Sequence, residues 1–180
     1  DITVYIPTNV NADLTLDVVT LLHGVYGSHW AWAMNGGVHK TTHRLIQQGK
    51  MRPMVLVMPS DGLHGDGSGY LKHQQEDDEK WIVEDVITVV KEQITSVHEK
   101  SNFFITGLSM GGYGALRLGA KYPEIFRSFS GLSSITEFNQ MALFLEQGEF
   151  EKLSELVLTH ENVMDCILAN KERLPHFYFD

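Results

Sequence analysis

Residues Ser101–Tyr122 read SNFFITGLSMGGYGALRLGAKY, and this stretch decides how the chain is expected to fold. Its first part, Phe103–Thr106, is a short apolar and β-prone run, which predicts a buried strand. The segment after it is too rich in glycine for a regular strand or helix, and a run of small residues then predicts a helix that begins near Gly111. The stretch therefore predicts a strand, a tight turn and a helix in direct succession.

The centre of this turn is a serine flanked by glycines, in the order Gly107-Leu108-Ser109-Met110-Gly111. A nucleophilic serine on a strained strand-to-helix turn needs glycine two residues before and after it, because other backbone passes close by there. The start of the helix also places free N–H groups and the positive end of the helix dipole beside the hydroxyl. We therefore expect Ser109 to be a catalytic nucleophile. The alternative, a structural turn with a bystander serine, is disfavoured by the strand and helix on either side.

The rest of the chain alternates between strand and helix patterns. Runs of apolar and β-branched residues predict further strands at residues 1–7, 17–22, 53–59, 126–130 and 175–180. A 3.6-residue apolar period predicts a long helix over 79–97, a shorter helix is expected at 42–48, and 135–171 is expected to form a helical cap or excursion. This order predicts an α/β fold, with a mostly parallel central sheet and helices on both faces.

Three loops should meet at one edge of this sheet. The segments His23–Ser28 and Ser60–Tyr70 each follow a predicted strand, and Ser109 follows a third. Ligands bind at the carboxyl ends of parallel strands in open α/β sheets, so we expect the site to lie where these loops converge.

A serine hydroxyl needs a base and an oxyanion hole to attack an ester. The turn supplies one donor, the backbone N–H of Met110, and the loop after the neighbouring strand should supply a second through the N–H of Val25. His23 is expected either to contact substrate or to position this loop. Tyr26, Trp30 and Trp32 are expected either to line a substrate pocket or simply to pack.

Composition excludes several classes of protein. The 180 residues are 43% hydrophobic and 21% charged, which is typical of one globular domain with a sizeable core. A net charge of −9 without a cluster of Lys and Arg argues against nucleic-acid or anionic-membrane partners. Cys166, the single cysteine, is expected to be a small buried hydrophobe. With no charged-then-apolar leader and no run of membrane-spanning length, the sequence favours a cytoplasmic location.

No metal site is expected. The loop residues Asp61, His64 and Asp66 match neither an EF-hand nor a zinc spacing and are expected to form a solvated turn. The Glu76–Lys80 charge run is expected to be a solvated helix entrance.

Four stretches in order carry a resemblance to a known family. They are Leu21-Leu22-His23-Gly24, Val57-Met58-Pro59, Trp81-Ile82-Val83-Glu84-Asp85 and the ten residues from Gly107 to Leu116. Together they resemble the esterase D branch of the α/β-hydrolases, which includes tributyrin esterases, S-formylglutathione hydrolases and feruloyl esterases. The resemblance implies hydrolysis of short or medium acyl esters by an acyl-enzyme on Ser109, without a cofactor. An acyltransferase of the same fold and a non-catalytic binding module remain the alternatives.

The sequence departs from this family at its end. A triad of this fold runs in the chain order Ser, then Asp or Glu, then His, and the family's acid lies several residues beyond the position that matches Asp180. The candidates His160, Asp165 and His176 are disfavoured by their predicted positions. We therefore expect residues 1–180 to form a single but incomplete domain, lacking the acid and histidine. The last strand would be an exposed sheet edge, which favours a homodimer.

Overall fold

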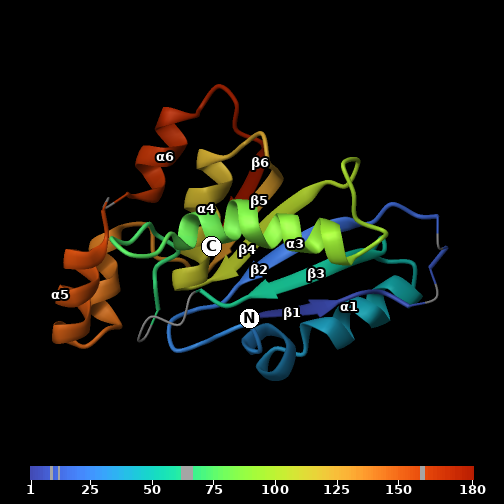
Figure 1. Ribbon diagram of the computed structural model, residues 1–180, viewed down its shortest axis with the longest axis horizontal. Helices are drawn as coiled ribbons and strands as arrows, with labels where there is room; N and C mark the ends of the chain where they lie inside the picture. The colour runs from blue at the N-terminus through green and yellow to red at the C-terminus, as the bar shows by residue number, and fades with distance from the viewer. Residues whose placement is uncertain (9, 12, 62–66, 159–160) are drawn as a thin grey trace.

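A six-stranded sheet forms the centre of the computed structural model, which describes residues 1–8, 10–11, 13–61, 67–158 and 161–180 (Figure 1). The strand order is β1-β3-β2-β4-β5-β6, and all neighbours are parallel except β1 and β3. The strands are β1 (Ile2–Tyr5), β2 (Asp17–Leu22), β3 (Met54–Pro59), β4 (Phe103–Leu108), β5 (Phe126–Leu132) and β6 (His176–Phe179). The predicted α/β architecture with a mostly parallel sheet is confirmed.

Helices cover both faces of this sheet. In β3, alternate side chains point to opposite faces and join two different cores. Val55 and Val57 point into the larger core, beneath α3 (Val86–Gln93) and α4 (Met110–Lys121). The alternate residues of β3 join a smaller core against η1, a single π-helical turn over Ala31–Asn35, and α1 (Val38–Gln47). Figure 1 shows α3 and α4 lying across one face of the sheet.

Two helices have boundaries that differ from the predicted ones, and the backbone shows why. The first helix begins at Val38 rather than residue 42, because Gly37 before it adopts a left-handed conformation with φ 59° that turns the chain into the helix. The long helix consists of three consecutive pieces, α2 (Asp78–Lys80), η2 (Trp81–Asp85) and α3. It ends at Gln93 rather than residue 97, since the backbone of Ile94 is extended.

The expectation of a solvated entrance to this helix is wrong for two of the four acidic residues in the Glu76–Lys80 run. Asp78 and Glu79 are buried, with 3% and 8% of their surface exposed. Glu79 accepts a hydrogen bond from the guanidinium of Arg117, a side chain of α4 that is itself completely buried. The sequence pattern did not reveal this pair because its members lie 38 residues apart.

The segment between β5 and β6 leaves the sheet and forms three short helices. They are η3 (Phe138–Leu143), α5 (Gln147–Leu156) and α6 (Val163–Ala169), and α6 packs against α4. Cys166 of α6 is buried, which raises the pKa of its thiol to about 11. The expectation of a small buried hydrophobe at this position is confirmed. His160 lies outside the described residues.

One part of the sheet is open to solvent. The aromatic side chains of β6, the last strand of the sheet, are 41–58% exposed. Beside them a shallow hollow of about 540 Å³ lies over the sheet, and Val19, Phe104 and Tyr178 line part of it. The apolar run of β2 is typical of a strand buried on both faces, and this is wrong at Val19, which lines the hollow and is only half-buried.

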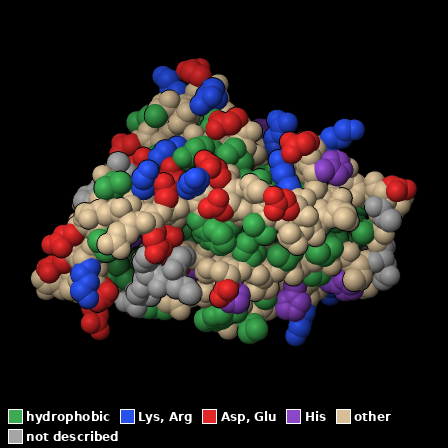
Figure 2. Space-filling model, in the orientation of Figure 1, with side chains coloured by type: hydrophobic (Ala, Val, Ile, Leu, Met, Phe, Trp, Pro, Cys, Tyr) green, Lys and Arg blue, Asp and Glu red, His purple; other side chains and the backbone are tan. Residues whose placement is uncertain are grey.

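The described surface carries charges of both signs. Figure 2 shows Lys, Arg, Asp and Glu side chains mixed over the face that carries α3 and α4. No helix among the described residues is both long and apolar enough to cross a bilayer. In the same residues, no three or more His, Cys, Asp and Glu side chains group as metal ligands would.

Candidate active site

Ser109 is the only residue between β4 and α4, and its backbone is strained. Its φ of 57° and ψ of −118° lie where a residue with a side chain is rarely found. Two glycines make this turn possible. A Cβ on Gly107 would lie 2.0 Å from the carbonyl oxygen of Gly111, and one on Gly111 would lie 2.3 Å from that of Leu22. The predicted succession of strand, tight turn and helix is confirmed.

The loop after β2 lies directly against this turn. The parallel register pairs Leu22 with Gly107, so both strands end at the same edge of the sheet. A Cβ on Gly24 would lie 3.4 Å from the Cβ of Ser109 and 4.0 Å from its hydroxyl oxygen. The expected convergence of these two loops is therefore confirmed. Of the third loop, residues 62–66 lie outside the described residues, and with them His64 and Asp66.

Val25 and Met110, which can each offer a backbone N–H, line a cavity together with Ser109. Met110 is the first residue of α4, where an N–H has no partner within the helix. Val25 is half-buried in the adjacent loop and lines cavities on both sides of Ser109. Within the described parts of the chain, neither N–H donates to another protein group. Both are thus available to a ligand.

A buried pair of side chains, His23 and Asp61, contacts the loop after β2. His23 and Asp61 are each 2% exposed, and His23 Nε2 lies 3.4 Å from Asp61 Oδ1. The other ring nitrogen, Nδ1, bonds the carbonyl oxygen of Gly24 at 2.8 Å. Burial alone would raise the pKa of Asp61, but the hydrogen bond and charge of His23 and the N–H of Ser68 bring it below its ordinary value. The expectation of a solvated turn is therefore wrong at Asp61.

The side chain of Tyr70 holds the same loop by bonding to the loop's backbone. Its ring is completely buried, and its hydroxyl donates to the carbonyl oxygen of His23 at 2.9 Å. Burial raises the pKa of this hydroxyl well above its ordinary value, so it remains a donor. Sequence reasoning missed Tyr70 and Asp61 as supports of the site. Their place after β3, at the carboxyl edge of the sheet, was the available signal.

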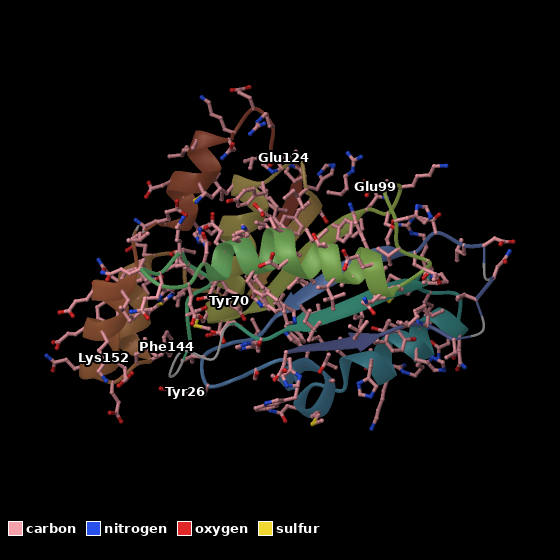
Figure 3. All side chains as sticks on the ribbon, in the orientation of Figure 1. Tyr26, Tyr70, Glu99, Glu124, Phe144 and Lys152 are labelled. Carbon is pink, nitrogen blue, oxygen red and sulfur yellow. The ribbon has the colours of Figure 1, made fainter. Side chains whose placement is uncertain are left out.

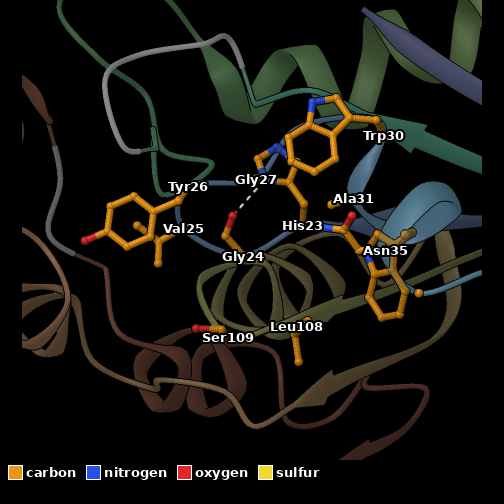
Figure 4. A pocket seen from close by; sticks show the side chains of 12 residues that line it. His23, Gly24, Val25, Tyr26, Gly27, Trp30, Ala31, Asn35, Leu108 and Ser109 are labelled. Carbon is orange, nitrogen blue, oxygen red and sulfur yellow. Dashed lines mark hydrogen bonds between the residues drawn. The ribbon is translucent and has the colours of Figure 1, made fainter.

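A cleft of about 500 Å³ opens on one side of Ser109 (Figure 4). Tyr26 and Trp30 line it, and their contact with substrate stays a prediction. Trp32 also borders the cleft, but its indole N–H donates to the carbonyl oxygen of Leu22 at 3.0 Å and its ring packs in the smaller core. For Trp32 the packing alternative therefore holds.

A much smaller apolar cavity lies on the other side of Ser109. Met141 and Phe144, from η3 and the residue that follows it, line this cavity together with Val25. The Tyr26 hydroxyl donates to the carbonyl oxygen of Phe144, so the loop after β2 is tied to the excursion (Figure 3). Tyr26 reaches this position from a left-handed backbone conformation with φ 61°.

The remaining triad candidates lie elsewhere. No histidine of the described residues hydrogen-bonds the Ser109 hydroxyl. His176 pairs with Ser128 at the opposite edge of the sheet, as its position in the sequence predicts. Asp165 accepts a bond from Asn162 on the excursion, while Asp180 accepts the N–H of Ser133 at 2.6 Å.

Comparison with known proteins places this geometry in a family. A model of the Putative esterase family matches residues 1–164. The chain belongs to this family. The esterase D resemblance of the sequence is thereby confirmed.

Relatives of this esterase family share both sequence and fold with the chain. An acetyl esterase of Caldicellulosiruptor saccharolyticus is 28% identical over 129 residues, which are 71% of this chain and 44% of the relative. The structure of a ferulic acid esterase is similar at 25% identity with a TM-score of 0.67, over 75% of this chain and 54% of that one. A fluorophosphonate-binding serine hydrolase of Staphylococcus aureus, 22% identical, shares the fold with a TM-score of 0.76, over 99% and 71%. The chain thus spans about half the length of the first two proteins.

Proposed function

We propose that this protein is a serine carboxylic-ester hydrolase that works through an acyl-enzyme on Ser109. The observation that carries the proposal is the strained backbone of Ser109, between a strand and the first turn of a helix. Such strain persists only where the surrounding structure enforces it, and it concentrates at functional sites. Family membership and the acetyl and ferulic acid esterase relatives support the same reaction.

The reaction would proceed in two halves. The Ser109 oxygen attacks the ester carbonyl carbon while a base takes the hydroxyl proton, and the alcohol then leaves with a proton. Water attacks the resulting acyl-enzyme, releases the carboxylic acid and restores the serine. No described residue is assigned as the base.

The free N–H groups of Val25 and Met110 are proposed as the oxyanion hole. Both residues line a cavity with Ser109, and neither N–H donates to another group within the described chain. The negative charge that develops on the carbonyl oxygen would be held by these two donors and by the positive end of the α4 dipole.

His23 is proposed to position the oxyanion loop rather than to act as the base. Its ring is 2% exposed and is held between the Gly24 carbonyl and the Asp61 carboxylate. Tyr26 and Trp30 are proposed to contact substrate, since both line the large cleft beside Ser109.

Hydrolysis of p-nitrophenyl acetate tests the proposal. We expect Ser109→Ala to abolish hydrolysis while its circular dichroism spectrum stays that of the wild type. Ser133→Ala is the matched control, because Ser133 is also a serine with positive φ at this edge of the sheet, outside both cavities. A wild type that hydrolyses the ester no faster than Ser109→Ala does, with measurable activity in both, would disprove the proposed function.

A further inference from the structure

Ser109 lies between two cavities of very different size. One holds only about 10 Å³ for the centre of a water-sized sphere, whereas the other holds about 500 Å³. We propose that this asymmetry sorts the two halves of an ester: a two-carbon acyl group enters the small cavity, and a bulky, ring-bearing alcohol occupies the large cleft. The inference rests on the proposed function, because it takes Ser109 as the attacking group.

The small cavity matches a methyl group. A water-sized sphere fits in it with little room to move, since only about 10 Å³ is open to the centre of that sphere. Apart from Ser109, its lining is entirely apolar, and Ile135 and Met141 are 8% and 3% exposed. An acetyl methyl would fill this space, while each further methylene would have to displace a packed side chain, which costs free energy.

Two methionines that line the small cavity pack against backbone. A Cβ on Gly69 would lie 2.8 Å from the terminal methyl of Met141, so that methyl already rests against backbone. Met110 is packed in the same way against Gly67, where a Cβ would lie 2.6 Å from its terminal methyl. Moving either methionine to admit a longer acyl chain would break these contacts, which adds to the cost of a longer chain.

The cavity is also fixed at its outer side. Phe144 contributes to its lining, and the Phe144 carbonyl accepts the hydroxyl of Tyr26. This bond ties the residue after Val25 to the end of η3. It thereby fixes the distance between the oxyanion loop and the apolar wall.

The assignment of the two halves follows from the chemistry. The acyl group stays bonded to Ser109 until water arrives, so it can sit in the narrower cavity, which both Val25 and Met110 border. The alcohol must depart after the first half-reaction, which the wider cleft allows. The large cleft presents Trp30 and Tyr26 to it, and flat aromatic surfaces favour contact with a ring.

Two substrate series test the inference, one for each half of the ester. With p-nitrophenol as the constant alcohol, we expect kcat/KM to fall at least tenfold from acetate to hexanoate. With acetate as the constant acyl group, we expect a lower KM for benzyl acetate than for ethyl acetate, whose alcohols are similar leaving groups. Trp30→Ala should remove this difference in KM.

Substitutions in η3 test the small cavity directly. Met141→Ala should raise the hexanoate-to-acetate ratio of kcat/KM about tenfold. Leu143→Ala is the control on the same helix: its side chain is 76% exposed and outside the cavity lining, so the ratio should stay at the wild-type value.

Two results would overturn the inference: a wild-type protein that prefers hexanoate to acetate, or a folded Met141→Ala variant with an unchanged ratio. The wild-type series stands even if Met141→Ala fails to fold. A fluorophosphonate probe distinguishes failure of the cavity assignment from failure of the proposed function. A protein that is labelled on Ser109 but prefers hexanoate contradicts the cavity assignment alone, whereas an active protein that is not labelled on Ser109 contradicts both.

Discussion

At the scale of single residues, the site depends on positions where no side chain fits. Gly107 and Gly111 each lie against backbone atoms rather than against flexible side chains, so a substitution there cannot be absorbed by a change of rotamer. This is why the turn that carries Ser109 could be predicted from five letters of sequence. The strained conformation and the glycines that permit it are all local.

The close approach at Gly111 predicts a stability effect. Gly111→Ala would place a Cβ 2.3 Å from the Leu22 carbonyl oxygen, so β2 and α4 would have to separate. We expect the free energy of unfolding in urea to fall by about 1–3 kcal/mol or more. Gly148→Ala is the control, since no atom lies within 4 Å of a Cβ there. It should be neutral or stabilising by roughly 0.5–1 kcal/mol. Equal effects of the two substitutions would refute the close-packing argument.

The proposed oxyanion hole predicts a difference between two substitutions of Val25. Val25→Pro removes the N–H and should reduce kcat on p-nitrophenyl acetate by about 10²–10³. Val25→Leu keeps the N–H and should have a much smaller effect. Thermal unfolding of both variants serves as the control for folding. If the two variants lose activity to the same extent while both remain folded, the side chain rather than the N–H matters at this position.

At the scale of elements, buried charges join segments that are far apart in the sequence. Arg117 of α4 pairs with Glu79 of α2 and with Glu161 before α6, and Lys121 pairs with both carboxylates. This network of ion pairs thereby holds α4 against α2 and against Glu161.

This network predicts a pH dependence of stability. Burial alone would raise the pKa of Glu79, but the charge of Arg117 and the bonds from Tyr122, Lys121 and Arg117 lower it from 4.5 to about 2. Because the folded pKa is the lower one, Glu79 contributes its full stability above the unfolded pKa. The contribution is lost as pH falls from 4.5 to about 2.

Glu79→Gln tests this dependence by urea unfolding across pH. At pH 7 the variant should unfold with a free energy lower by about 2–4 kcal/mol, because it leaves Arg117 buried with one charged partner fewer. This difference in unfolding free energy between wild type and Glu79→Gln should become smaller below pH 4.5. Glu84→Gln is the control: Glu84 is 63% exposed in its pair with Lys80, and its loss should cost about 0.5 kcal/mol or less. A difference that is constant with pH would contradict the account.

These elements also show where prediction from the sequence ends. The succession of strands along the chain, the strand–turn–helix around Ser109 and the convergence of the first two loops follow from local patterns and from the rule that parallel strands end at one edge. The burial of Asp61 and Glu79 does not, because their partners His23 and Arg117 lie 38 residues away in each case. A charged residue looks solvated in a sequence until its distant partner is known.

At the scale of the whole molecule, the two edge strands of the sheet differ. β1 ends it with an antiparallel strand, whereas β6 ends it with exposed aromatic side chains, among them Phe177 and Phe179. An edge strand with unpaired backbone and apolar side chains can pair with another chain. The homodimer expected from the sequence remains a proposal, and β6 is the surface on which it would form.

This edge predicts self-association of residues 1–180. We expect light scattering to show a mass that rises with concentration. Tyr178→Lys should reduce the association, since charge on an edge strand opposes pairing. Val89→Lys is the control, an exposed apolar side chain on α3 at the far side of the sheet, and it should leave the mass unchanged. A clean monomer at high concentration would exclude this proposal.

The central claim, that Ser109 becomes acylated, is tested most directly by trapping the intermediate. The protein would be mixed with excess p-nitrophenyl acetate, quenched in acid within the first turnover and digested for mass spectrometry. The account predicts one acetyl group on the peptide that contains Ser109, and none in Ser109→Ala. Rapid turnover with no acetylated Ser109, or acetylation of another residue that persists in Ser109→Ala, would contradict it.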